Sequence, residues 1–161
     1  MFVRQHTGKQ PLEVAADRIA RASHAALDAL ERLRRAIGAS ISLAWTEQFD
    51  GVAVIEVYPA ATLRASGVVE MGYGRLENAK ARVRIATALR HEISNLGEYV
   101  GRSPHVFDAC LCLVAAKHFL DGCAMAPPEE LIDAARKEGW IWVRGLDPHP
   151  TASTSPSRER C

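Results

Sequence analysis

The sequence has no long hydrophobic run, no secretory signal and almost no excess charge. No apolar run reaches the roughly 18 residues that a membrane helix needs. The first residues, MFVRQHTGKQPLEV, lack the apolar core of a signal sequence. The formal net charge is only +1, so the chain as a whole exerts no attraction on nucleic acids or membranes. Binding to either requires a local basic patch.

Cysteine is scarce as well. The four cysteines, at positions 110, 112, 123 and 161, match no zinc-ligand spacing. Free thiols in a reducing, cytoplasmic environment are therefore the simplest expectation.

The rest of the composition is that of a globular protein. The chain has 161 residues, of which 48% are hydrophobic and 24% charged, enough for one soluble domain with a real core. We expect this domain to span residues 1–146. Residues 147–161 are rich in Pro, Ser and Thr, which predicts a disordered tail.

Periodic apolar positions predict four helices. The first begins at Pro11 and ends before Gly38, and the second runs from Leu76 and ends near Gly97. The third has Ser103 as its N-cap and ends before Gly122, and a short fourth covers 129–137.

Two stretches predict strands, at 52–58 and 139–143, with a loop between Pro59 and Gly74. Strands that alternate with helices indicate an α/β layering. Two strands are too few to cover three long helices, however. The sheet is therefore expected to be short of strands.

A carboxylate stands inside the first of these strands. Glu56 lies in VIEVYP, three residues before the proline that ends the strand. A buried carboxylate needs a cation, a metal or access to water, and sites in open α/β sheets form at the carboxyl ends of strands. The alternative is an edge strand in which Glu56 lies on a solvent-exposed face.

A second acid, Asp108, lies in the first turns of the third helix. Its neighbours Leu111 and Cys112 are apolar, so Asp108 is expected to border the core. His105 shares its face one turn earlier. Asp108 either interacts with the helix dipole or helps, with His105 as a further ligand, to bind magnesium or manganese, which prefer oxygen ligands.

Four segments in order resemble one family: TGKQPLEVAADRIAR at 7–21, VIEVYPAA at 54–61, FDACLCLVAA at 107–116 and EGWIWV at 138–143. The family is the domain of unknown function 429, predicted nucleases with a ribonuclease-H-like fold. The resemblance covers roughly residues 5–145. It implies an α/β fold, a mixed sheet flanked by helices, in which clustered acids hold divalent metal.

By this resemblance Glu56 takes the role of the acid on the fourth strand, and Asp108 that of the acid on the last long helix. His105 stands where many relatives of the fold have another acid. The resemblance also implies an N-terminal part that this chain lacks, with the first three strands and an aspartate. Either the chain is a truncated copy, or a complementing polypeptide or a second copy pairs along the open sheet edge.

The resemblance implies metal-dependent hydrolysis of phosphodiesters, in which Glu56 and Asp108 bind the ions. Residues 75–102 contain six Lys or Arg and three Asp or Glu, which favours contact with nucleic acid through Lys80, Arg82 and Arg84. A solvated helix face is the alternative.

Asp17 and Arg18 are expected to form a structural salt bridge. Two other functions stay open: a catalytically silent interaction module and a phosphotransferase on the same fold.

Overall fold

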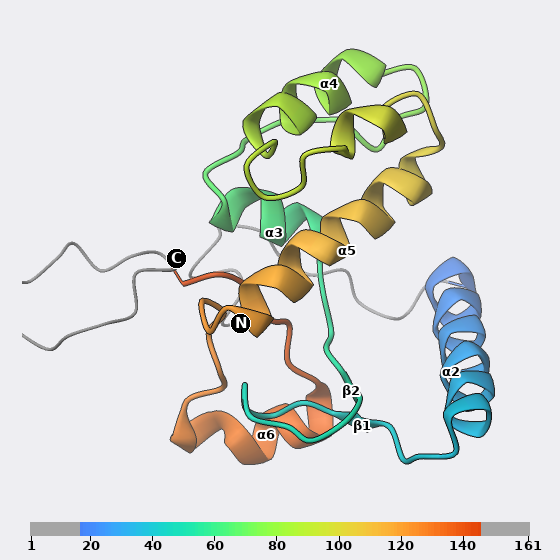
Figure 1. Cartoon of the computed structure of the whole chain (residues 1–161), viewed down its shortest axis with the longest axis vertical. Coiled ribbons are helices and arrows are strands. Elements are labelled where there is room, and N and C mark those ends of the chain that lie inside the picture. Colours follow the sequence, from blue (N-terminus) through green and yellow to red (C-terminus); the bar gives the residue numbers. More distant parts are fainter. Residues whose placement is uncertain (1–16, 146–161) are drawn as a thin grey trace, which may run out of the picture.

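The computed structural model of the chain describes residues 17–145. These residues form five α-helices and two 3-10 helices: α2 Asp17–Ile37, α3 Pro59–Ala65, α4 Ala79–Ala88, η1 Leu96–Tyr99, α5 Pro104–Leu120, η2 Glu129–Leu131 and α6 Ile132–Glu138. In Figure 1, α3 and α4 lie against the upper part of α5, whereas α6 and the strands lie below its lower end. The helix α2 stands to one side.

The sheet is small. Strand β1 (Ser42–Leu43) pairs in parallel with β2 (Ala53–Val54). The chain then stays extended, and Glu56 forms a single parallel bridge with Ile141. The α/β class is thus confirmed, but the strand expected at 52–58 is shorter, and 139–143 forms only a bridge. Extended residues form a ladder only where a partner strand lies opposite them, and residues 17–145 supply few such partners.

The segment expected to be a loop after Pro59 begins with a helix instead. Pro59 occupies the first turn of α3, where its missing N–H costs no hydrogen bond. Ala61, Leu63 and Ala65 bury one side of α3 in the core. The second predicted helix is shorter than expected, because α4 begins after the Asn78 cap and ends at Ala88.

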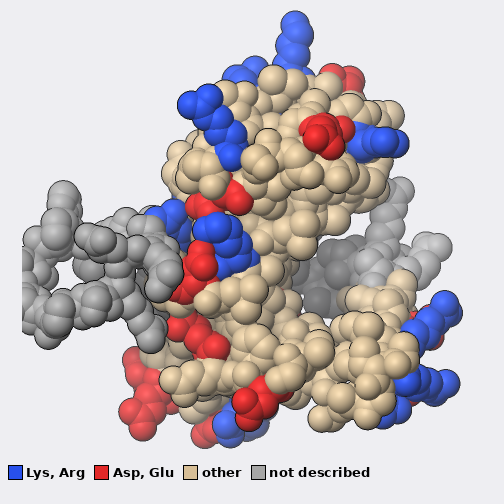
Figure 2. Space-filling view, viewed as in Figure 1, with Lys and Arg blue, Asp and Glu red and all other residues tan. Residues whose placement is uncertain are grey.

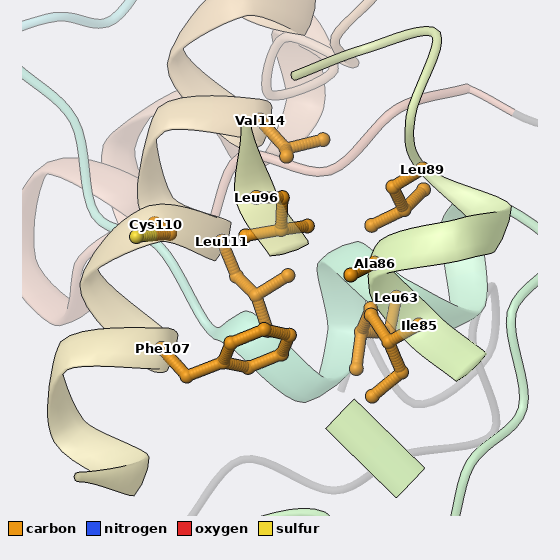
Figure 3. Packing of buried hydrophobic residues seen from close by; sticks show 9 residues of the cluster. All are labelled: Leu63, Ile85, Ala86, Leu89, Leu96, Phe107, Cys110, Leu111 and Val114. Atoms are coloured by element: carbon orange, nitrogen blue, oxygen red, sulfur yellow. The ribbon is translucent and has the colours of Figure 1, made fainter. Parts of the chain in front are cut away.

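The third predicted helix is confirmed as α5, which forms the centre of the core. The Ser103 hydroxyl accepts a hydrogen bond from the N–H of Val106 at 3.3 Å, which caps the first turn. Figure 3 shows apolar side chains of α5 facing those of α3, α4 and η1. The buried members of this cluster are Leu63, Ile85, Ala86, Leu89, Leu96, Phe107, Cys110, Leu111 and Val114.

A second cluster joins the lower end of α5 to the strands and α6. Trp142 packs edge-on against Phe119, with ring centroids 4.7 Å apart. Its indole N–H donates to the carbonyl of Ala44, which follows β1, at 3.3 Å. Residues 139–143 (the GWIWV segment), which include Trp142, therefore anchor the sheet region to α5.

The helix α2 contributes no residue to the buried clusters formed by the described part of the chain. It ends at Ile37 as predicted, and Gly38 follows with φ +67°. Its apolar side chains Leu27, Leu33 and Ile37 are exposed. The predicted start at Pro11 lies outside the described residues. The side chains of Asp17 and Arg18 are likewise not described.

Within residues 17–145, no helix is both long and apolar enough to cross a bilayer. Cys110 and Cys112 have free thiols, as expected, whereas Cys123 is disulfide-bonded. The predicted tail at 147–161 lies outside the described part of the chain, and the cytoplasmic location stays a prediction.

Candidate functional site

Glu56 lies at the end of the extended segment after β2, and its side chain is exposed. One carboxylate oxygen accepts a hydrogen bond from the backbone N–H of Trp140 at 2.7 Å. The backbone carbonyl of Glu56 accepts another from the N–H of Trp142 at 3.0 Å. Glu56 thus reaches solvent, as one alternative predicted, and it also holds the segment after α6 in place.

Asp108 borders the core, as its helical neighbours predict. It is half-buried on α5 and accepts a hydrogen bond from the Tyr73 hydroxyl at 3.0 Å. Burial raises the pKa of Asp108 above its usual value, against the opposing effects of the Tyr73 hydrogen bond and of nearby His105. Burial and the charge of Asp108 also raise the pKa of Tyr73, which keeps its hydroxyl a donor. His105 itself is exposed.

Of the three predicted metal ligands, Glu56 and Asp108 engage different partners, and His105 is exposed. Glu56 is bonded to the segment after α6, and Asp108 is bonded to the loop before α4. Among the described residues there is no group of three or more His, Cys, Asp or Glu side chains that could hold a metal ion. Residues 17–145 by themselves therefore do not fit a magnesium or manganese centre.

The three predicted phosphate-binding cations have different surroundings. Lys80 is exposed near the start of α4. Arg84 is exposed and forms a bidentate pair with Glu70, with N–O distances of 2.6 and 2.9 Å. Lys80 and Arg84 can both contact a substrate from the surface.

Arg82, in contrast, points into the protein and is only 1% exposed. Its guanidinium donates to four backbone carbonyls at 2.8–3.0 Å: those of Tyr73, Arg75, Leu76 and Val100. These bonds fasten the loop before α4 and the turn after η1 to α4. Arg82 therefore has a structural role, which helical periodicity alone does not distinguish from a surface role.

Figure 2 shows how charge is distributed on one face of the molecule. In this view Lys and Arg side chains lie at the top, over α4, and at the lower right, over α2, whereas acidic side chains gather mainly at the left and along the bottom. The basic residues on this face thus form separate groups. Contact with nucleic acid through the α4 region stays a prediction.

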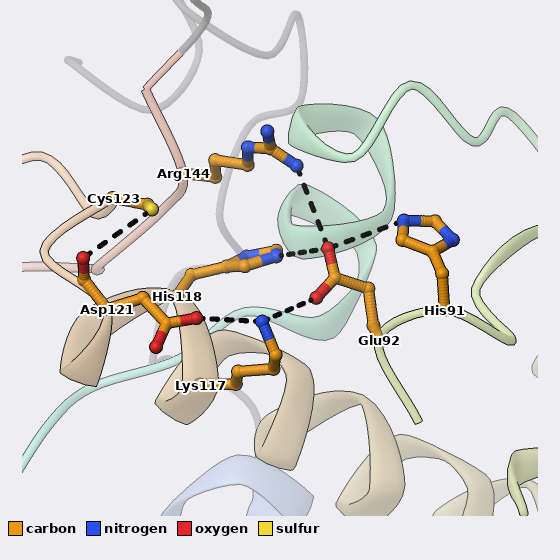
Figure 4. Close-up of polar contacts among 7 residues, drawn as sticks. All are labelled: His91, Glu92, Lys117, His118, Asp121, Cys123 and Arg144. Carbon is orange, nitrogen blue, oxygen red and sulfur yellow. Dashed lines mark hydrogen bonds and ion pairs between the residues drawn. The ribbon is translucent and has the colours of Figure 1, made fainter. Parts of the chain in front are cut away.

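The structure also assembles a polar cluster that the sequence did not reveal (Figure 4). Glu92 follows α4, and its side chain is only 6% exposed. One carboxylate oxygen lies 3.0 Å from Nε2 of His118, and the other lies 3.1 Å from Nζ of Lys117. Nε2 of His91 and a guanidinium nitrogen of Arg144 lie 3.6 and 3.7 Å away.

These side chains border an open hollow of about 310 Å³ near the end of α5. Burial opposes ionisation of Glu92, but the hydrogen bonds from His118 and Lys117 prevail and hold its pKa below the usual value. Residues 91, 117, 118 and 144 show no ligand spacing in the sequence. The cluster depends on how the turn after α4, α5 and the last described segment meet.

A comparison with family models gives one match. The model described as Protein of unknown function (DUF429) matches residues 1–131, most of the chain. No curated protein matches the chain, and no solved structure does. The chain therefore belongs to the family described as Protein of unknown function (DUF429).

Proposed function

We propose that this chain has a ribonuclease-H-like fold and contributes carboxylates to a metal-dependent nuclease. Glu56 and Asp108 are the contributed ligands. Because residues 17–145 hold no complete metal centre, the remaining ligands come from residues outside this range or from another polypeptide. Magnesium or manganese would supply activation of water and stabilisation of the leaving oxygen.

The observation that carries this proposal is the state of Asp108. Its carboxyl group is half-buried on the central helix, and burial raises its pKa. Functional carboxylates often have such partly desolvated positions. Glu56 supports the proposal less strongly, because its hydrogen bond to Trp140 has a structural explanation of its own.

The test is a cleavage assay on the full chain with labelled single-stranded, duplex and branched DNA and RNA, with and without magnesium or manganese. We expect metal-dependent cleavage that Glu56→Gln and Asp108→Asn both abolish. Glu130→Gln and Asp133→Asn are matched controls, because both residues are exposed carboxylates away from the site. Cleavage unchanged in the two site variants would overturn the proposal, and absence of cleavage by folded protein would rule out a centre completed by this chain without a second polypeptide.

A second candidate function is association through α2 and the edge of β1. The apolar side of α2 is exposed, with Leu27 63% accessible, and Leu43 of β1 is exposed as well. Helices in proteins gain most of their stability by packing an amphipathic face, so the exposed apolar side of α2 favours a packing partner. Within residues 17–145, β1 pairs only with β2, so its other edge offers backbone groups for pairing with a partner.

This second function is tested by the oligomeric state of the full chain over a range of concentrations, using analytical ultracentrifugation. If the chain self-associates through this face, Leu27→Glu with Leu33→Glu shifts it to monomer. Ala25→Glu, a change at another exposed position of α2, leaves association unchanged. A monomer at every concentration would rule out self-association and leave only a different polypeptide as the partner.

A further inference from the structure

Four nitrogen-bearing side chains converge on a single carboxylate beside the end of α5. Lys117, His118, His91 and Arg144 all approach Glu92 within 4 Å. Since each lies next to the same group, they are also close enough to one another to contact one small ligand. We propose that the hollow beside them binds a phosphate group, either as inorganic phosphate or as a phosphate monoester.

The lining of the hollow favours a small, polar, anionic ligand. Six of its seven side chains are ionisable, those of His91, Glu92, Lys117, His118, Asp121 and Arg144, and the seventh belongs to the disulfide-bonded Cys123. The volume of about 310 Å³ is at the lower end of the range for small-molecule sites, which is ample for a phosphate.

The donors come from three separate segments and therefore from different directions. Lys117 offers a rotatable ammonium group from α5, and Arg144 offers a planar fork from the last described segment. The imidazole of His91 approaches from the turn after α4. Donors that surround a point suit a tetrahedral phosphate, whose oxygens point in four directions, better than a flat carboxylate.

The binding groups have enough exposure to turn toward a ligand. The side chains of His91 and Lys117 are 67% and 45% exposed, whereas Glu92 beneath them is almost fully buried. Glu92 thus forms the floor of the hollow, and the cations form its rim. A phosphate that enters would draw the rim groups outward without disturbing the buried contact between Glu92 and His118.

Glu92 also competes with the ligand, because its carboxylate attracts the same cations. Among the lining groups, the charges of Lys117 and Arg144 are balanced by those of Glu92 and Asp121. Removing one of the two negative charges leaves an excess positive charge in the hollow. The proposal therefore makes an unusual prediction, that loss of the Glu92 charge strengthens phosphate binding.

The experiment is calorimetric titration of the full chain with inorganic phosphate, adenosine 5′-monophosphate and adenosine, in metal-free buffer at constant ionic strength. We expect both phosphate-bearing probes to bind and adenosine to fail. Lys117→Met is expected to weaken phosphate binding about tenfold or more, the loss of a charge-assisted contact. Lys137→Met, which removes an exposed lysine of α6, is the matched control.

Glu92→Gln is expected to tighten phosphate binding several-fold, provided that circular dichroism shows a folded protein. If the Glu92→Gln variant does not fold, the Lys117→Met variant still tests the site independently. Equal binding in the Lys117→Met and Lys137→Met variants, no binding of either phosphate probe, or equal binding of adenosine would overturn the proposal. The assay needs neither cleavage nor metal, so its outcome is separate from that of the nuclease proposal.

Discussion

The Glu56 carboxylate accepts a hydrogen bond from the backbone N–H of Trp140 at 2.7 Å, across 84 residues of sequence. This contact fixes the start of the GWIWV segment beside the end of the β2 segment. Next to it, Trp142 packs into the second core cluster. Glu56, which the sequence predicts to be a metal ligand, therefore also holds two distant segments of the chain together.

We expect Glu56→Ala to lower the free energy of unfolding by about 1–2 kcal/mol, because the N–H of Trp140 loses its acceptor. Glu56→Gln keeps an acceptor oxygen and should cost less. Urea denaturation of both variants measures the difference. The control is Glu47→Ala, an exposed acid, which should stay within about 0.5 kcal/mol of the unmodified chain. Equal losses in Glu56→Ala and Glu47→Ala would show that the hydrogen bond contributes nothing.

Gly139→Ala is expected to be destabilising for two reasons. Gly139 has φ +91°, a conformation that other residues rarely adopt, and an added Cβ would collide with the Glu56 carboxylate. We expect a loss of about 1–3 kcal/mol in the free energy of unfolding. A double-mutant cycle with Glu56→Ala separates the two causes. If the collision matters, the double variant loses less than the sum of the single losses; strict additivity would assign the whole effect to the backbone.

Asp108 should make stability depend on pH in an identifiable direction. Burial raises its pKa in the folded state above the ordinary value of 3.8, so the unfolded state releases the proton first. The contribution of Asp108 to the free energy of unfolding therefore falls as the pH rises from its ordinary pKa to above its raised, folded-state pKa. The asparagine of the Asp108→Asn variant cannot ionise. Over this pH interval the free energy of unfolding should therefore fall for the unmodified chain relative to that of the variant. Parallel pH profiles of the two proteins would contradict the raised pKa.

Glu92 should show the opposite dependence. Hydrogen bonds from His118 and Lys117 lower its folded-state pKa despite burial, so its stabilising contribution is present above the ordinary value of 4.5. The contribution is lost as the pH falls through the lowered pKa. The difference in unfolding free energy between the unmodified chain and Glu92→Gln should be largest near neutral pH and shrink on acidification. A difference that grows toward low pH would refute the lowered pKa.

Arg82 and Arg84 form a matched pair on one helix with opposite surroundings. Arg82→Met deprives four backbone carbonyls of their donor and should cost about 3 kcal/mol or more in unfolding free energy. Arg84→Met removes only an exposed pair with Glu70 and should cost much less. Chemical denaturation compares the two. Similar losses would show that the internal hydrogen bonds of Arg82 are weak.

Local sequence signals determined much of the helical structure. Ser103 and Pro104 mark the start of α5, and Gly38 and Gly122 follow the ends of α2 and α5, because capping and backbone freedom act within one helical turn. The inward position of Asp108 also followed from its helical neighbours. By the same signals Pro59 could have been assigned to the first turn of α3, but a proline after a strand marks a loop equally well.

The tertiary structure decided the rest. Strand lengths at 52–58 and 139–143 depended on which segments lie opposite them, and the depth of Arg82 depended on the loop that folds over α4. The cluster around Glu92 depended on three segments that meet only in the folded chain. Helix signals are carried by neighbours within a few residues, whereas strand pairing, burial of charge and polar clusters are set by contacts between distant residues, which no local pattern records.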